Sequence, residues 1–258
     1  MSQIKFERAP PLAWITLDRP AKRNAISSAM WQRIPAIAHD VAADRKTRVA
    51  LLQGAGDAAF SAGADIEEMH QALGHPAAMR AMQAAVQLGQ QEWSQIPQPT
   101  IAVIDGICAG GGCGLALACD LRLATARSTF TIPPAKLGLV YSLADTRRLV
   151  AVVGPARAKE MLFTGRHVAA DEALAIGLIN AIVPPDELTE RATQLALSIA
   201  GQAQSSVRSA KRIVNLIVAG QVTESAESQA LYDGSFSSDD FREGALAFRD
   251  KRKPQFPA

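Results

Sequence analysis

Two glycine-rich segments hold the residues best suited to chemistry. Residues 60–66 (FSAGADI) and 109–114 (AGGGCG) each follow a strand-like run and precede a helix-like run. Small side chains leave the backbone N–H groups uncovered, and the first N–H groups of a helix have no partner inside it. The helix start also carries the positive end of the dipole. If the two segments converge, they can hold negative charge that develops on one oxygen atom. The pattern therefore predicts an oxyanion hole built from backbone amides.

The elements around these segments alternate between strands and helices up to about residue 185. This alternation predicts an α/β fold with covered sheets. The strands are short and irregularly spaced, which favours a layered spiral over a doubly wound sheet. From Asp186 onward the chain is predicted to be helical as far as Lys253. We therefore expect a core over residues 1–186 and a helical region over residues 187–258.

Composition excludes several classes of function. The 258 residues carry a net charge of +2, so we expect neither nucleic acid nor a membrane as a partner. Cys108, Cys113 and Cys119 are odd in number and lie in an apolar stretch, as buried thiols in a reducing compartment do. The first seven residues contain no signal-peptide pattern. We expect a cytoplasmic protein.

Three other motifs give weaker evidence of function than the glycine-rich segments. Residues 54–59 (GAGDAA) match a dinucleotide fingerprint, but no long apolar-periodic helix follows directly, so a turn with positive φ is favoured. Residues 60–63 resemble a serine-nucleophile elbow without its first glycine, and no histidine stands out as its partner. The spacing of the cysteines and histidines predicts no metal site.

The glycine segments resemble the signatures of a known family. Residues 60–69 (FSAGADIEEM) are similar to the first signature of the crotonase, or enoyl-CoA hydratase/isomerase, superfamily, and residues 104–120 are similar to its second. Further agreement lies in Asp18-Arg19-Pro20, Asn24-Ala25, Leu137-Gly138, the segment 153–158 (VGPARA), Ala173, and the segment 177–183. The resemblance covers nearly the whole chain.

The resemblance implies a crotonase-like spiral of ββα turns with a helical C-terminal trimerisation region, and a homotrimer or a dimer of trimers. It implies an acyl-CoA thioester as the ligand, with coenzyme A as part of the substrate and no other cofactor. By position, it implies that the backbone N–H groups of Ala64 and Gly111 form the oxyanion hole.

The same resemblance implies residues that bind the CoA thioester. Lys22 and Arg23 are candidates for the CoA phosphates, with solvated surface charge as the alternative. Phe248 and Lys251 match positions that reach the CoA of a neighbouring subunit, with ordinary helix packing as the alternative. The other expected contacts are Ala25, Ala62, Asp65, Ile66, Gly110 and Pro134.

The chain departs from the hydratase pattern at two positions. Hydratases of this family use two glutamates to hold a water molecule and move its protons, and the matching positions are Gly114 and Pro134. Neither residue can transfer a proton. One account assigns the transfer to another group, with Tyr141 and Ser142 as candidates. Asp145 is close in sequence, and we expect it to cap a helix.

Two other accounts remain open. In one, the enzyme decarboxylates a malonyl-type CoA thioester, so that loss of CO₂ forms the enolate and Tyr141 donates a hydrogen bond. In the other, the chain binds acyl-CoA without turnover. We expect an acyl-CoA-processing enzyme of the hydratase/isomerase family that stabilises a thioester enolate.

Overall fold

The fold contains two β-sheets. A computed structural model describes residues 3–256. The strands are β1 (Ile4–Ala9), β2 (Leu12–Leu17), β3 (Val49–Gly54), β4 (Ala59–Ser61), β5 (Thr100–Ile104), β6 (Ile107–Ala109), β7 (Leu121–Thr125), β8 (Thr129–Thr131), β9 (Val168–Ala169) and β10 (Ala181–Val183). One sheet has the order β1-β2-β3-β5-β7-β10 and the other has the order β4-β6-β8-β9. Pairing is parallel except between β1 and β2 and between β8 and β9.

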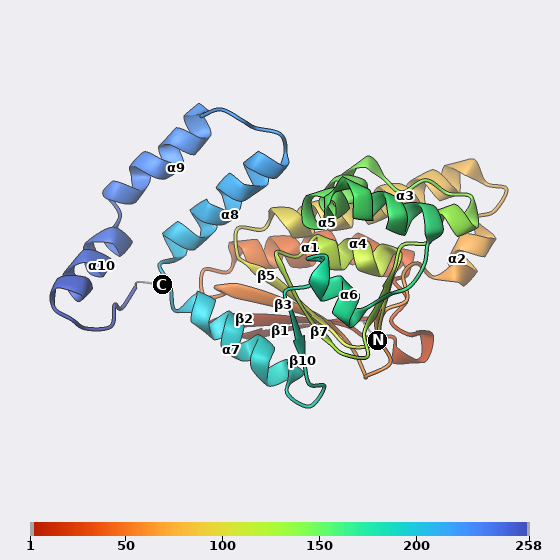
Figure 1. Ribbon diagram of the computed structural model, residues 1–258, viewed down its shortest axis with the longest axis horizontal. Coiled ribbons are helices and arrows are strands. Elements are labelled where there is room, and N and C mark those ends of the chain that lie inside the picture. Colours follow the sequence, from red (N-terminus) through yellow and green to blue (C-terminus); the bar gives the residue numbers. More distant parts are fainter. Residues whose placement is uncertain (1–2, 257–258) are drawn as a thin grey trace.

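Helices cover both faces of the larger sheet (Figure 1). They are α1 (Ser28–Ala43), α2 (Ile66–Gln71), α3 (Pro76–Gln95), α4 (Gly111–Leu117), α5 (Leu143–Thr164), α6 (Ala170–Ala175), α7 (Leu188–Ala200), α8 (Gln204–Val218), α9 (Ala226–Phe236) and α10 (Asp239–Arg249), with short 3₁₀ turns η1 (Pro20–Lys22) and η2 (Pro134–Leu137). Strand side chains alternate between the faces. Ala50 and Leu52 enter the core that holds α1, α3, α4 and α5, whereas Val49 and Leu51 enter the core that holds α7.

The chain repeats one structural unit. A strand of the larger sheet is followed by a strand of the smaller sheet and then by helix, as in β3-β4-α2, β5-β6-α4 and β7-β8-α5. In each repeat, a helix follows the strand of the smaller sheet after a loop of varying length. Both glycine-rich segments occupy this position, after β4 and after β6, and β4 and β6 are paired in parallel. The ββα spiral therefore brings the two segments to the same edge of the smaller sheet.

The C-terminal helices divide into two groups. Helix α7 packs on the larger sheet, where its apolar stripe is buried (Leu188, Ala192, Ala196 and Ala200). Helices α8 to α10 form an arm that projects away from the sheets (Figure 1). Lys211 of α8 ties the arm to the core by donating to the Gln98 carbonyl at 2.9 Å and to Asp120 Oδ2 at 2.8 Å. Within residues 3–256, no helix is both long enough and apolar enough to cross a membrane.

Several elements of the fold differ from what the sequence pattern predicts. Strands β1, β4 and β6 are not predicted, and β4 begins the segment that the sequence favours as loop. The sequence pattern predicts separate helices over residues 145–153 and 155–163. The structure joins them in one element, α5, with a kink at Gly154, whose φ is 75°. Strands β4 and β6 have only three residues each, which is too short to show a clear period of two.

A buried arginine closes the C-terminal end of α4. The side chain of Arg122 donates to the carbonyl of Leu178 at 2.8 Å and to those of Cys119 and Ala116 at 2.8 and 3.3 Å. Arg122 is only 5% exposed, and burial lowers the pKa of its guanidinium. Because these acceptors are backbone carbonyls, this arginine links the C-terminal end of α4 to the segment that leads into β10.

Replacing this arginine should destabilise the protein. Arg122→Met leaves buried carbonyls without donors, which costs roughly 1–3 kcal/mol of unfolding free energy. Arg127→Met is the matched control, because Arg127 pairs with Asp105 at the surface, where a pair contributes up to about 1 kcal/mol. Urea denaturation of both variants measures the difference, and equal losses would contradict this role for Arg122.

Candidate active site

The loop from β4 to α2 directs one backbone amide away from its neighbours. Ile26 N donates to the Gly63 carbonyl at 2.7 Å, and Asp65 N donates to the Ile26 carbonyl at 3.3 Å. In such a parallel bridge, the N–H of the intervening residue faces the opposite side. The Ala64 N–H therefore points away from Ile26. Gly111 begins α4, so its N–H has no acceptor inside the helix.

The two glycine-rich segments lie in direct contact. A Cβ atom built on Gly63 would be 2.9 Å from the Ala109 carbonyl oxygen and 3.4 Å from Gly111 N. A Cβ atom built on Gly111 would be 3.9 Å from Ala64 N. Gly63 and Gly110 have φ angles of 97° and 50°, which favour glycine. The packing thus leaves room for backbone only and brings the loop of Ala64 against the start of α4.

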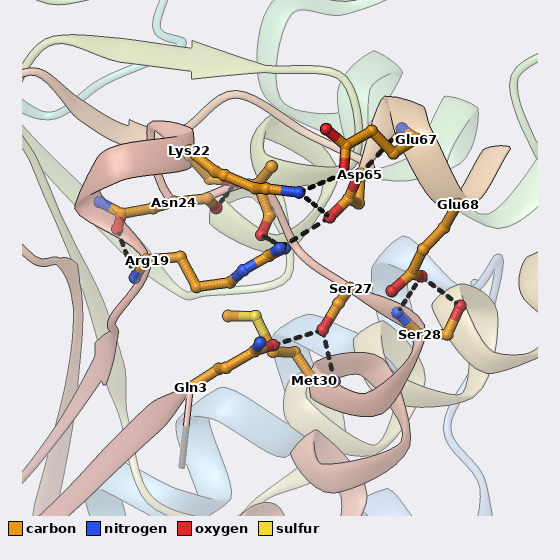
Figure 2. A network of polar contacts seen from close by, with 12 residues as sticks. Gln3, Arg19, Lys22, Asn24, Ser27, Ser28, Met30, Asp65, Glu67 and Glu68 are labelled. Atoms are coloured by element: carbon orange, nitrogen blue, oxygen red, sulfur yellow. Dashed lines mark hydrogen bonds and ion pairs between the residues drawn. The ribbon is translucent and has the colours of Figure 1, made fainter. Parts of the chain in front are cut away.

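A charged network holds the first loop in place (Figure 2). Arg19 donates to Asp65 Oδ2 at 2.7 Å and to the Ala25 carbonyl at 2.8 Å. Asp65 caps α2 by accepting from Glu67 N at 3.0 Å. Burial raises the pKa of the Asp65 carboxyl, but the Arg19 hydrogen bond and the Glu67 amide outweigh it, so the pKa lies below its usual value. Lys22 donates to Glu67 at 2.5 Å and lies 3.6 Å from Asp65.

A second group of contacts joins the same loops. The buried Asn24 side chain donates to the carbonyls of Ala55 and Ala59 at 2.9 and 2.7 Å. Ala62 N donates to the Arg23 carbonyl at 2.9 Å. Glu68 of α2 accepts from both the N and the Oγ of Ser28 at 2.7 Å, which ties α2 to α1 (Figure 2). The segments around residues 19–28 and 59–68 therefore form one rigid unit.

A polar cluster lies beside Gly114, one turn along α4 from Gly111. A Cβ atom on Gly114 would be 3.0 Å from the Tyr141 hydroxyl oxygen and 3.2 Å from Asp145 Oδ1, and it would overlap the Gln90 amide. The hydroxyl of Tyr141 is buried and has no hydrogen-bond partner within residues 3–256. Burial, followed by the charge of Asp145, raises its pKa well above 10, so Tyr141 stays protonated.

Several neighbouring groups form hydrogen bonds with Asp145. Ser142 is the N-cap of α5: its Oγ accepts from Asp145 N at 3.0 Å and donates to Asp145 Oδ2 at 2.7 Å. The cap expected of Asp145 is therefore made by Ser142. Arg148 donates to Oδ1 at 3.2 Å, and the Gln90 amide nitrogen, turned toward the carboxylate, donates at 2.5 and 3.2 Å. Asp145 is 4% exposed, and burial raises the pKa of its carboxyl.

Other predicted site residues lie at varying distances from this region. Pro134 begins η2, and Ile66 begins α2 with its side chain exposed. Phe248 lies on α10 and Lys251 follows it, so both belong to the arm. Helix α10 lies apart from α2 in Figure 1. The sequence did not single out Gln90 or Arg148, because only the fold brings α3 and α5 together at Gly114.

The described part of the chain shows no metal-binding group. Among residues 3–256, no three His, Cys, Asp or Glu side chains gather as ligands. Cys108, Cys113 and Cys119 are buried and unpaired, and burial raises the pKa of the Cys119 thiol to about 11.

The comparison with known proteins identifies the family. The family model described as enoyl-CoA hydratase/isomerase matches residues 7–258. The chain belongs to the enoyl-CoA hydratase/isomerase family. It is 34% identical over 257 residues to a crotonyl-CoA hydratase of Syntrophomonas wolfei, covering 98% of this chain and 97% of the relative. It is 31% identical over 257 residues to a short-chain-enoyl-CoA hydratase of Clostridium acetobutylicum, with the same coverage of both chains.

A solved structure supports the same assignment. A crystal structure of an enoyl-CoA hydratase/isomerase family protein from Hyphomonas neptunium superimposes with a TM-score of 0.96 at 40% identity, covering 99% of this chain and 98% of that one. The ββα spiral is thus the crotonase fold, as the sequence predicted. Membership of the hydratase/isomerase family makes this chain an enzyme of acyl-CoA metabolism, without fixing the specific reaction.

A side chain at Gly63 should separate the two loops. Gly63→Ala combines a positive φ with a close approach to Ala109, so we expect a loss of about 1–3 kcal/mol of unfolding free energy. Gly234→Ala in α9 is the control, since a Cβ there meets nothing within 4 Å, and the change should gain up to about 1 kcal/mol. Thermal unfolding compares the two variants. A Gly63→Ala protein as stable as the unaltered one would show that the loops have room for a side chain.

Proposed function

We propose that the enzyme forms and stabilises the enolate of an acyl-CoA thioester, with the N–H groups of Ala64 and Gly111 as the oxyanion hole. The contact between Gly63 and the start of α4 supports this proposal, because it brings the two segments so close that a Cβ atom built on Gly111 would lie 3.9 Å from Ala64 N. Losing one such donor typically costs about 3–4 kcal/mol in the transition state. Gly110, next to Gly111, leaves room for the thioester and has no side chain that could react with it.

We propose that CoA lies along the two loops that the charged network joins. The expected contacts Ala25, Ala62, Asp65 and Ile66 belong to this unit, and Pro134, at the start of η2, is a further expected contact. Arg23 makes no ion pair within the described residues and is exposed, so it is available to a phosphate. Lys22 already pairs with Glu67, so its use by a phosphate requires exchange of that partner.

Simple hydration should be slow in this enzyme. Gly114 and Pro134 supply no carboxylate, and a side chain on Gly114 has no room beside Tyr141, Asp145 and Gln90. Activation of water requires a base and protonation of carbon requires an acid. The pair of groups that hydration needs is therefore incomplete.

A second candidate reaction is decarboxylation of a malonyl-type thioester. The buried, unpartnered hydroxyl of Tyr141 favours it, since a protonated phenol donates a hydrogen bond without removing a proton. In this reaction the departing CO₂ leaves its electrons in the enolate, and the oxyanion hole holds the charge. No strong base takes part.

A panel of thioesters read by mass spectrometry tests these alternatives. The upper end of ordinary enzyme turnover is about 10³ per second. We expect the turnover rate for hydration of crotonyl-CoA to be far below this value, and a rate near it would contradict the proposal. Release of CO₂ from malonyl-CoA or methylmalonyl-CoA would favour the second candidate. If Tyr141→Phe then left that activity intact, Tyr141 would have no part in it.

We also propose that the protein assembles as a homotrimer or a dimer of trimers in the cytoplasm. The arm exposes large apolar side chains (Val214, Ile217, Val218, Tyr232, Phe236, Phe241, Leu246 and Phe248), which is unusual for a surface in water. Phe248 and Lys251 could then reach the CoA of a neighbouring subunit. Light scattering should give a mass that is a multiple of three chains of 27.4 kDa, and a monomeric mass would contradict this assembly.

A further inference from the structure

One carboxylate approaches the place that the missing glutamate would occupy. Asp145 Oδ1 lies 3.2 Å from the position of a Cβ on Gly114, although it comes from α5 and not from α4. The glycine and the aspartate are complementary, because any side chain at position 114 would enter the space of the carboxylate. The absence of a side chain on α4 thus coincides with the presence of an acidic one on the facing helix.

The contacts of Asp145 fit a carboxylate that can gain and lose a proton. Ser142 and Gln90 orient it as neutral donors. Arg148, the one cation in contact with it among residues 3–256, favours its ionised form. Burial acts in the opposite direction and raises the pKa of the carboxyl. The neighbouring Tyr141 is an alternative, but its phenol stays protonated at neutral pH and so cannot act as the base.

We propose that Asp145 is the proton-transfer group of this site and that it serves the movement of a double bond along the acyl chain. This proposal rests on the enolate-forming function proposed above. Hydration needs two groups that act on water and carbon, whereas a double-bond shift needs one group that acts twice. A site with one carboxylate beside an oxyanion hole matches the second requirement.

The step is balanced without any further reactant. The Asp145 carboxylate removes a proton from Cα of a 3-enoyl thioester, and the electron pair of that C–H bond moves to the carbonyl oxygen. The resulting dienolate is held by the amides of Ala64 and Gly111. Asp145 then returns the proton to Cγ, the carbonyl reforms, and the product is the 2-enoyl thioester.

Two assays on Asp145→Asn test the proposal. The first follows conversion of 3-butenoyl-CoA to 2-butenoyl-CoA, and the second follows deuterium uptake at Cα of butanoyl-CoA in D₂O, which needs no double bond. We expect Asp145→Asn to slow both by 10²- to 10⁴-fold, the usual contribution of general acid–base catalysis. Asp105→Asn is the matched control, since Asp105 is also held by an arginine, Arg127, but lies outside the site. We expect it to retain both rates within about twofold.

A pH profile separates a chemical role from a structural one. The groups that face Asp145 are Ser142 and Arg148 from α5, Gln90 from α3, and Tyr141. Since the ionised carboxylate is the base, the rate should fall as the pH drops through its pKa. Arg148→Gln removes the neighbouring cation, so this fall should move to higher pH. This variant also tests the proposal if Asp145→Asn does not fold.

Three results would overturn the proposal. They are full exchange in a folded Asp145→Asn protein, an unmoved acid limb in Arg148→Gln, and loss of exchange in Tyr141→Phe while Asp145→Asn retains it. Failure of the proposed function has a different signature. In that case the unaltered protein would neither bind the thioesters nor catalyse exchange, whatever residue stands at position 145.

Discussion

The close approach of two backbone segments is the constraint on which the rest of the site depends. Gly63 and the start of α4 are so near that a single methyl group would collide with a carbonyl oxygen. This approach requires that β4 and β6 pair in parallel and that each lead into a helix. The ββα spiral meets both conditions, and Arg19, Asn24 and Asp65 hold the first loop against the second.

The family's fold is present. We proposed that Gly114 and Pro134 take the positions of the two glutamates of its hydratases. The space next to Gly114 is filled from the facing elements by Gln90, Tyr141 and Asp145. In the proposed function, the scaffold stabilises an enolate through backbone amides, and Asp145 moves the protons.

The sequence predicted the elements that local patterns encode. The glycine segments, the α/β class and the helical C-terminus all follow from residue types and spacing, and the crotonase fold followed from the family resemblance. The contacts of Gln90 and Arg148 with Asp145 could not be predicted, since they depend on how α3 packs against α5. Strands β4 and β6 are too short to show periodicity. Ser142 caps α5 in place of Asp145, because the helix begins earlier than the sequence suggested.

A crystal structure with acetoacetyl-CoA bound tests the central claim most directly. The account predicts the thioester carbonyl oxygen about 2.7–3.1 Å from both Ala64 N and Gly111 N, the range for donors to an oxyanion. An ordered thioester whose oxygen contacts neither amide, or binds elsewhere on the molecule, would contradict it.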